Sequence, residues 1–231
     1  MKRVLLTVAA SVLILSAFGQ YKNFSRISIG AGVGMTQSYT DVKQPGMAQS
    51  VRINADYYFT PFLTAGMEGQ FGKLHGGDVL TDPHKREFTN SYMAVTANGK
   101  VHLGQFINYS LSPILSNIKG LYIGTGLGII NNSMSDIVRT APGSDYVFPG
   151  MDKSMNIVLP FNAGLEYGLD DYWGKTRFLV TAGFQFNFTF GEGIDGYNDP
   201  PAKFKNTMPD VYTFTTIGIK YCLGPEGLFS R

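Results

Sequence analysis

The sequence has little charge, a single cysteine and no long internal apolar run. Of its 231 residues, 16% are charged, whereas a soluble domain usually carries about 25%. One cysteine leaves no partner for an internal disulfide, so the fold must be held together by other means. No internal stretch of ~18 apolar residues predicts a membrane-spanning helix. Neither a disulfide framework nor a helical bundle in the membrane is therefore expected.

The one unbroken apolar run lies at the N-terminus. It extends from Val4 to Leu15, follows Lys2 and Arg3, and precedes Ala17-Phe18-Gly19. A basic start, a short apolar stretch and small residues at the cleavage site are typical of a secretory signal peptide. We expect residues 1–19 to be this peptide and residues 20–231 to be a single exported domain. No cysteine follows the apolar run, which argues against a lipoprotein anchor.

The charge balance of the mature chain argues against nucleic acid as a partner. Without Lys2 and Arg3, 17 basic residues remain against 17 acidic residues. Nucleic-acid-binding domains usually show a strongly basic balance or a basic patch. We therefore expect no nucleic-acid partner.

From Phe24 onward, the strongest pattern is alternation of apolar and polar residues, which indicates strands rather than helices. Eight runs show this pattern, and most reach the ~9–11 residues that a tilted strand needs to cross a bilayer. The runs are 26–36, 51–59, 63–72, 92–103, 121–129, 155–167, 177–190 and 211–223. We expect each run to be one strand of an antiparallel sheet.

Alternation alone does not say which face of the sheet lies inside. A soluble ligand-binding barrel of the lipocalin type would place the apolar face inward. The polar face, however, is rich in glycine and poor in charge, which suits the crowded interior of a narrow barrel. Aromatic residues also gather near both ends of the apolar face, as in the girdles of membrane barrels. These observations favour an all-β, eight-stranded antiparallel up-and-down transmembrane β-barrel, with the soluble barrel as the alternative.

The connections support the same interpretation if the N-terminus lies in the periplasm. The outward connections are then long and the inward ones mostly short, as in outer-membrane barrels. The outward ones are 37–50, 74–87, 132–152 and 191–208, and the inward ones are 60–61, 105–119 and 169–175. In segment 105–119, Ser112 and Pro113 predict the N-cap and first residue of a short helix. That helix would rest on the rim or membrane surface, or would dock a partner.

The last run carries the most specific motif. Thr216 is polar, Gly218 follows two positions later, and Tyr221 and Leu223 are hydrophobic and spaced by one residue. This pattern resembles the signal by which the barrel assembly machinery recognises outer-membrane proteins. The chain from 24 to 223 resembles small eight-stranded barrels of the OmpA/OmpX type, and looks closest to the outer-membrane β-barrel family that includes PorT-like proteins. The resemblance implies an integral outer-membrane location, with lipid and the assembly machinery as partners.

Charged residues on the polar face are expected to meet in the lower lumen. Buried charges are stable only when they are paired, so we predict a salt-bridge network that fills and closes the barrel. Its predicted members are Arg26, Asp56, Glu68, Lys100, His102, Glu166, Arg177 and Lys220. Glu166 and Arg177 are predicted to be cross-strand neighbours. A narrow polar conduit and a catalytic or ligand site remain alternatives, and Cys222 is expected to pack in the lumen.

A lipid-modifying enzyme would need a nucleophile or base near the outer leaflet, usually a Ser/His/acid set. His102 is expected at the wrong depth, and His75 and His84 lie near the second outward loop. Three acids of the last outward loop match no calcium-binding spacing; they are Asp195, Asp199 and Asp210. We therefore predict no catalytic residues, no cofactor and no metal site.

Aromatic residues also occur in the outward loops. They are either ordinary exposed side chains or a recognition surface for a protein or glycan partner. They are Tyr39, Tyr146, Phe148, Tyr197 and Phe204. The resembled family is functionally diverse, so the fold does not name an activity. We expect a non-enzymatic structural, adhesion or secretion-accessory barrel that acts through its outer loops or periplasmic rim. A lipid-modifying enzyme and a narrow pore are the alternatives.

Overall fold

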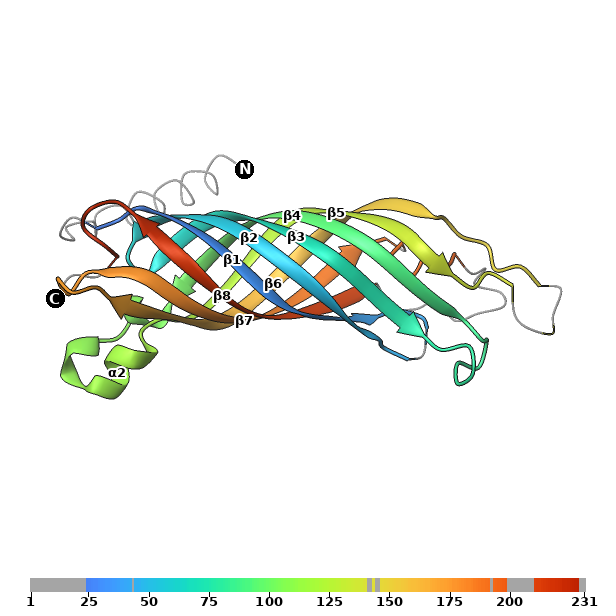
Figure 1. Cartoon of the computed structure of the whole chain (residues 1–231), viewed down its shortest axis with the longest axis horizontal. Helices are drawn as coiled ribbons and strands as arrows, with labels where there is room; N and C mark the ends of the chain where they lie inside the picture. Colours follow the sequence, from blue (N-terminus) through green and yellow to red (C-terminus); the bar gives the residue numbers. More distant parts are fainter. Residues whose placement is uncertain are drawn as a thin grey trace, which may run out of the picture.

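The computed structural model describes residues 24–42, 44–140, 143, 146–191, 193–198 and 210–228. Eight antiparallel strands form one closed barrel, in which each strand pairs with the next and β8 pairs with β1 (Figure 1). The strands are β1 (Ile27–Tyr39), β2 (Met47–Thr60), β3 (Leu63–Gly77), β4 (Glu87–His102), β5 (Leu121–Ile137), β6 (Lys153–Asp170), β7 (Thr176–Phe190) and β8 (Val211–Leu223). The predicted eight-stranded up-and-down barrel is confirmed. The predicted signal peptide, residues 1–19, lies outside the described residues.

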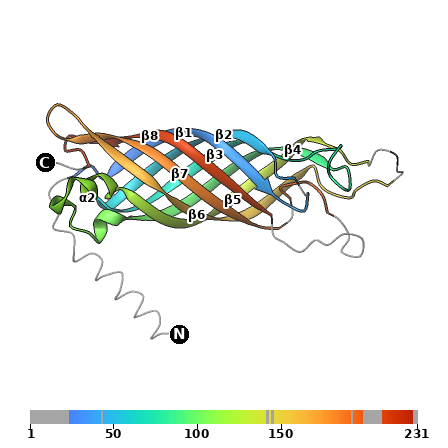
Figure 2. The same ribbon diagram turned by 90° about the horizontal axis from the view of Figure 1, so that it is seen from below.

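Closure of the sheet leaves no free strand edge. The register between β1 and β8 is unbroken from Ile27 opposite Leu223 to Tyr39 opposite Val211, and Figure 2 shows these two strands side by side. In a membrane every backbone N–H and C=O must be satisfied within the protein, and a closed barrel achieves this for strands. The fold therefore meets the main requirement for spanning a bilayer.

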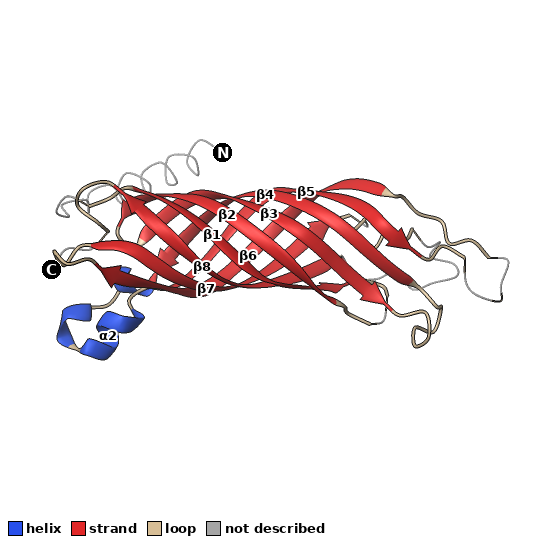
Figure 3. Ribbon diagram, in the orientation of Figure 1, coloured by secondary structure: helices blue, strands red, loops and turns tan. Residues whose placement is uncertain are grey.

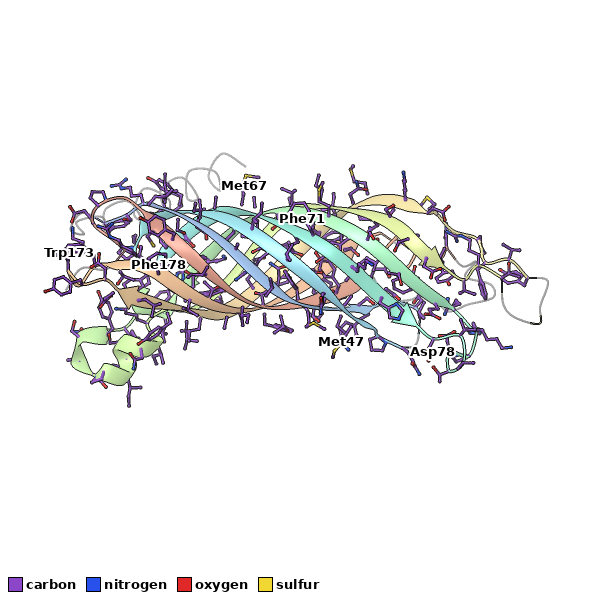
Figure 4. The ribbon with its side chains drawn as sticks, in the orientation of Figure 1. Met47, Met67, Phe71, Asp78, Trp173 and Phe178 are labelled. Atoms are coloured by element: carbon purple, nitrogen blue, oxygen red, sulfur yellow. The ribbon has the colours of Figure 1, made fainter. Side chains whose placement is uncertain are left out.

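The apolar face of the sheet points outward. Ile53 and Ile217 are exposed on the outer wall, whereas their sequence neighbours Asn54 and Thr216 are buried inside. Figure 4 shows Met67 and Phe71 projecting away from the barrel. An apolar outer wall matches hydrocarbon and would be unfavourable against water. The soluble lipocalin-type alternative, with its apolar interior throughout, is therefore wrong.

Glycines on the inward face make room for long charged side chains. A Cβ atom at Gly30 would lie 2.7 Å from Cγ of Lys220, and one at Gly32 would lie 3.1 Å from Nε of Arg52. The first distance is too short for two carbon atoms, so Lys220 would have to move. The glycine-rich polar face thus reflects crowding inside a narrow barrel.

Helical structure occurs between β4 and β5, at the end of the barrel that also holds Phe24 and Leu228. Two 3₁₀ turns, η1 (Leu103–Gln105) and η2 (Tyr109–Leu111), precede helix α2 (Pro113–Ile118), which Figure 3 shows in blue at this end. The hydroxyl of Ser112 accepts a hydrogen bond from the backbone N–H of Ile114, so the predicted N-cap is confirmed. No described helix is long and apolar enough to cross a membrane.

The strands extend further at the opposite end, which is the extracellular end if the short connections face the periplasm. Strands β5 and β6 contain 17 and 18 residues, well beyond the ~9–11 that a tilted strand needs to span. Strand β3 runs to Gly77 and β4 begins at Glu87, so the second outward loop is shorter than the predicted 74–87. Sheet structure therefore continues past the apolar belt.

Candidate functional site

The lower lumen contains a compact cluster of charged side chains from four strands. Nζ of Lys220 donates hydrogen bonds to Oδ2 of Asp56 and Oε1 of Glu166, both at 2.6 Å. Nζ of Lys100 lies 3.7 Å from Oδ1 of Asp56, and Nε2 of His102 lies 3.5 Å from Oε2 of Glu166. All five side chains are buried. The structure thus brings these five predicted members of the network together around the Lys220 ammonium.

Two further contacts hold the cluster in place. Nδ1 of His102 donates to the carbonyl oxygen of Phe62 at 3.1 Å, which leaves Nε2 facing Glu166. The ring of Tyr122 lies beside the cluster, with Nζ of Lys100 at 5.4 Å from its centroid. This distance is within the range of a cation–π contact. The cluster is therefore bounded by an aromatic wall on the β5 side.

A second polar layer crosses the middle of the lumen. Arg52 lies 3.5 Å from Glu68 through its guanidinium and donates to Oγ1 of Thr181 at 3.0 Å. Gln70 and Gln185 both donate to Oε1 of Glu68, at 2.9 and 3.0 Å. Arg52 was absent from the predicted network, although it shares the inward parity of Asn54 and Asp56. Alternation alone was sufficient to find it.

The charges of the two layers balance. Three cationic side chains face three carboxylates in these two layers, and His102 is the other side chain that takes part in their ion pairs. They are Arg52, Lys100 and Lys220 against Asp56, Glu68 and Glu166. A void of about 10 Å³ lies between Arg52, Tyr122 and Gln185, and such a volume holds about one water molecule. Side chains rather than a water column fill this level of the barrel.

Two predicted members of the network lie elsewhere. Arg26 precedes the first residue of β1, is exposed, and donates to the hydroxyl of Tyr57 at 3.2 Å. Arg177 pairs with Asp171 of the adjoining turn, with Nε 3.0 Å from Oδ2. The prediction that these two arginines belong to the lumen is therefore wrong.

The predicted Glu166–Arg177 pair is wrong for a reason of register. Glu166 lies opposite Thr181, not Arg177. The β6–β7 connection is a short turn in which Asp170 already pairs with Thr176, and the register shifts between Leu169 and Asp170. Strand β6 is thus longer than its sequence pattern indicates, so Arg177 lies at the rim.

An apolar cluster fills the extracellular end of the lumen, and we call it the extracellular plug. Inward-facing wall residues meet residues from the outward loops, all of them buried. Its members are Val42, Leu74, Phe88, Tyr92, Ala94, Ile130, Phe148, Val158, Ile194, Tyr197 and Tyr212. Phe148 and Tyr197 are only 3% and 4% exposed. The interpretation of these two loop aromatics as exposed side chains or a recognition surface is therefore wrong.

Segment 193–198 is held inside the mouth of the barrel by hydrogen bonds. Oδ2 of Asp210 accepts from the backbone N–H groups of Gly193 and Ile194, at 3.0 and 2.9 Å. Nδ2 of Asn90 donates to the carbonyl of Ile194 at 2.9 Å. The hydroxyl of Tyr197 lies 2.8 Å from the carbonyl oxygen of Val138, to which it donates. The segment is thus tied to three parts of the barrel.

The carboxyl of Asp195 is buried within this plug. Burial raises its pKa well above the usual range for aspartate, and the nearby carboxylate of Asp210 adds to the shift. The backbone N–H of Tyr197 donates to its Oδ1 at 3.0 Å and opposes the shift in part. Two of the three loop acids thus lie close together, whereas Asp199 lies outside the described residues, as does Phe204 among the loop aromatics. No group of three or more His, Cys, Asp or Glu suited to a metal ion occurs in the part of the chain that the structure describes.

The periplasmic end of the lumen is closed by a second, smaller cluster, the periplasmic plug. Buried Tyr58, Leu179 and Cys222 pack with Leu228 from the segment after β8, and Phe24 lies against them. The N–H of Leu228 donates to the carbonyl of Thr176 at 2.8 Å. The residues that extend past the last strand therefore fold back over the lower mouth.

The other two histidines do not converge on a nucleophile in the described contacts. Nδ1 of His75 lies 3.2 Å from Oγ1 of Thr89 on the neighbouring strand. The backbone N–H of His84 donates to Oδ1 of Asp82 at 2.9 Å within the second outward loop. Both residues are at the extracellular end, whereas His102 is in the lower lumen.

The predicted assembly signal lies on β8, where it follows the alternation of the wall. Thr216 is buried in the lumen, and Leu223 is exposed on the outer wall. The ring of Tyr221 packs against Phe178 of β7, with centroids 5.1 Å apart. A Cβ atom at Gly218 would lie 2.5 Å from the carbonyl oxygen of Ala31, so the close pairing with β1 requires glycine there. Recognition of these residues by the assembly machinery stays a prediction.

Comparisons with known proteins address the fold. No family profile and no curated protein matches the sequence. Among solved structures, Neisserial surface protein A (NspA) is similar, with a TM-score of 0.53 at 13% identity over 87% of this chain and 100% of that chain. Ail, the attachment invasion locus protein of Yersinia pestis, matches with a TM-score of 0.44 at 13% identity over 86% of this chain and 99% of that chain. The likeness to NspA shows a shared fold, that of small eight-stranded outer-membrane β-barrels.

Proposed function

We propose that this integral outer-membrane β-barrel is a non-enzymatic, non-conducting anchor that acts through the part of its sheet outside the membrane. The closed lumen carries the proposal. Three cations are matched by three carboxylates, and a plug lies at each mouth. An ion that entered would have to displace paired charges, which is costly in a site shielded from water. Transport through the lumen is thus unfavourable.

The outer wall changes character before the strands end. On β3 the outward side chains change from Phe71 to Lys73, and on β4 from Met93 to Ser91. Strand β5 changes at Asn131 and continues to Ile137. We call the outward-facing residues 73–77, 87–91, 131–137 and 153 the extracellular extension. A polar wall on a rigid sheet offers a preformed surface beyond the lipid.

The chemistry of this surface favours an anionic ligand. Lys73 lies opposite Ser91, Ser91 opposite Ser133, and Ser133 opposite Lys153, so the four residues form one row across four strands. Three strand spacings of ~4.8 Å separate the two lysines by roughly 14 Å. Both lysines are exposed, and neither forms an ion pair with the described residues. The extension also contains two carboxylates, Glu87 of β4 and Asp136 of β5, which lie further out than this row.

Two ammonium groups with hydroxyls between them fit a polymer that carries repeated negative charges and hydroxyl groups. An acidic glycan has this chemistry, because its charges recur along the chain and its sugars can hydrogen-bond to serine. We therefore assign the barrel an adhesive role toward acidic glycans.

The first experiment measures conductance. The purified protein, reconstituted in planar bilayers, is expected to stay at the baseline current. Steady, ion-selective currents from the wild type would favour the narrow-pore alternative and overturn the closed-lumen proposal.

A separate experiment tests the enzyme alternative. The barrel is incubated with outer-membrane lipid, and the lipid is then analysed by mass spectrometry. A covalent change in the lipid would contradict a non-enzymatic role.

The second experiment measures binding of a sulfated polysaccharide to the barrel in nanodiscs. The double change Lys73→Gln with Lys153→Gln is expected to weaken binding several-fold. The matched control, Lys119→Gln with Lys175→Gln, removes the same charge at the periplasmic end and is expected to leave binding unchanged. Equal losses in the two variants would mean that net charge alone drives binding, which would refute the extension as the site.

A further inference from the structure

The segment 103–120, which we call the periplasmic foot, carries strongly exposed apolar side chains. Phe106, Leu111 and Ile114 are 75%, 77% and 71% exposed, more than any hydrophobic residue of the lipid-facing wall, where Met155 reaches 68%. Large apolar side chains exposed together usually mark an interaction surface. Among the described residues of the periplasmic end, only the foot presents such a group on helical turns.

The foot has a defined conformation. The ring of Tyr109 packs edge-on against Phe62, with centroids 5.4 Å apart. The N–H of Gly104 donates to the carbonyl of Lys119 at 2.8 Å, which closes the base of the segment. The exposed apolar side chains of the foot are thus presented by a segment whose two ends are hydrogen-bonded to each other and whose Tyr109 packs on the barrel.

The charge of the foot suits a phospholipid surface. Residues 103–120 contain no aspartate or glutamate, and their only charged residue is Lys119. Its ammonium lies 5.0 Å from the ring centroid of Tyr109. A segment without carboxylates meets no repulsion from lipid phosphates, and a lysine near the membrane surface is attracted to them.

The position of the foot is continuous with the lipid-facing wall. Helix α2 lies beside the barrel, off its axis, at the periplasmic end (Figures 1 and 2). It occupies the same level along the axis as Trp173 and Phe178 (Figure 4). Tyr172 and Trp173, on the neighbouring β6–β7 turn, are also strongly exposed. Tyrosine and tryptophan are enriched where a membrane meets water.

We infer that the foot and the Tyr172-Trp173 turn lie in the headgroup region of the periplasmic leaflet and set the depth of the barrel in the membrane. The apolar side chains of the foot enter the upper acyl region, while its serine and asparagine residues remain in the hydrated layer, as in interfacial helices. Lipid is favoured over a periplasmic protein as the occupant because the adjoining wall is itself covered by lipid.

The test uses tryptophan fluorescence, because Trp173 is the only tryptophan in the chain. The full-length barrel is reconstituted in phosphatidylcholine vesicles whose lipids are brominated near the headgroup end of the acyl chain. The probe for the foot is Ile114→Trp in a Trp173→Phe background. The matched control is Leu80→Trp in the same background, since Leu80 is 92% exposed in an outward loop.

The expected result is a blue-shifted emission and several-fold stronger quenching by brominated lipid for Ile114→Trp than for Leu80→Trp. Wild-type Trp173 should also be quenched by the brominated lipid. Phe106→Trp provides a second position if Ile114→Trp fails to fold. Quenching equal to that of the Leu80 control, together with full access to aqueous iodide, would place the foot in water and overturn the inference in favour of a protein-docking surface.

Discussion

The change Lys220→Met removes the cation on which the lower lumen is centred. Lys220 is 2% exposed, and its Nζ lies 2.6 Å from both Asp56 and Glu166. Without it, the one ion pair left to Asp56 is with Lys100 at 3.7 Å, beside the neutral hydrogen bond from Asn54 at 2.6 Å. The one ion-pair partner left to Glu166 is His102 at 3.5 Å. Breaking a buried ion pair typically costs about 3–5 kcal/mol, because the remaining charge is left uncompensated. We expect a destabilisation of that order.

The assay is urea-induced unfolding of the barrel in detergent, followed by the loss of the compact, SDS-resistant form. Arg177→Met is the matched control, since it also replaces a paired cation by methionine. The Arg177 and Asp171 side chains are 31% and 19% exposed, and an exposed pair contributes about 0–1 kcal/mol. The free energy of unfolding should therefore fall several times more for Lys220→Met.

A double-mutant cycle separates the pair from general disruption of the lumen. Lys220→Met combined with Asp56→Asn should show a coupling energy of about 0.5–3 kcal/mol, as contacting residues do. Glu166→Gln combined with Arg177→Gln should show almost none, because these side chains lie on different levels. If Lys220→Met were no more harmful than Arg177→Met, the lumen would be hydrated and the reasoning from buried charge would be wrong.

Three further changes test other parts of the barrel. Asp195→Asn should remove a pH dependence of the stability of the extracellular plug. Burial raises the pKa of Asp195, so the folded plug keeps a proton that the unfolded chain releases. The wild-type plug should therefore weaken as the pH rises above the ordinary aspartate pKa of about 4 and through the raised pKa. Hydrogen exchange of residues 193–198 at pH 5 and pH 8 measures this, and identical profiles for wild type and variant would contradict it. Tyr221→Asp places a charge on the lipid face and should reduce membrane-integrated protein far more than Cys222→Ser in the lumen; equal yields in outer-membrane fractions would count against the face assignment. Leu228→Asp puts an unpaired carboxylate into the periplasmic plug and should lower the unfolding midpoint, and an unchanged midpoint would show that this plug adds no stability.

Local features of the sequence were sufficient for the architecture. Alternation with a period of two defines strands and sorts their residues into two faces, because every second side chain shares an environment. The glycine-rich polar face and the aromatic girdles then identify the apolar face as the outward one. The N-cap at Ser112 was also readable, because capping depends on residues within one helical turn. Arg52 belongs with these features, since its parity alone places it in the lumen.

Pairing across strands was not readable, because it depends on where turns and bulges fall. The shift between Leu169 and Asp170 and the short β6–β7 turn decide that Glu166 faces Thr181. A change of a few residues in the length of β6 moves Arg177 from the lumen to the rim. Arg26 precedes the first residue of β1, where its long side chain turns outward to the hydroxyl of Tyr57 instead of entering the lumen.

The alternating pattern, together with the glycine-rich polar face and the aromatic residues near both ends of the apolar face, determined that this chain forms a membrane barrel with a polar interior. Only the tertiary structure decided that the interior is closed at both mouths. Tyr197 reaches Val138, 59 residues away, and Leu228 reaches Thr176; neither contact leaves a trace in the local pattern. A loop aromatic that is solvated and one that fills a lumen have the same sequence signature, because the difference lies in how the loop folds back onto distant strands.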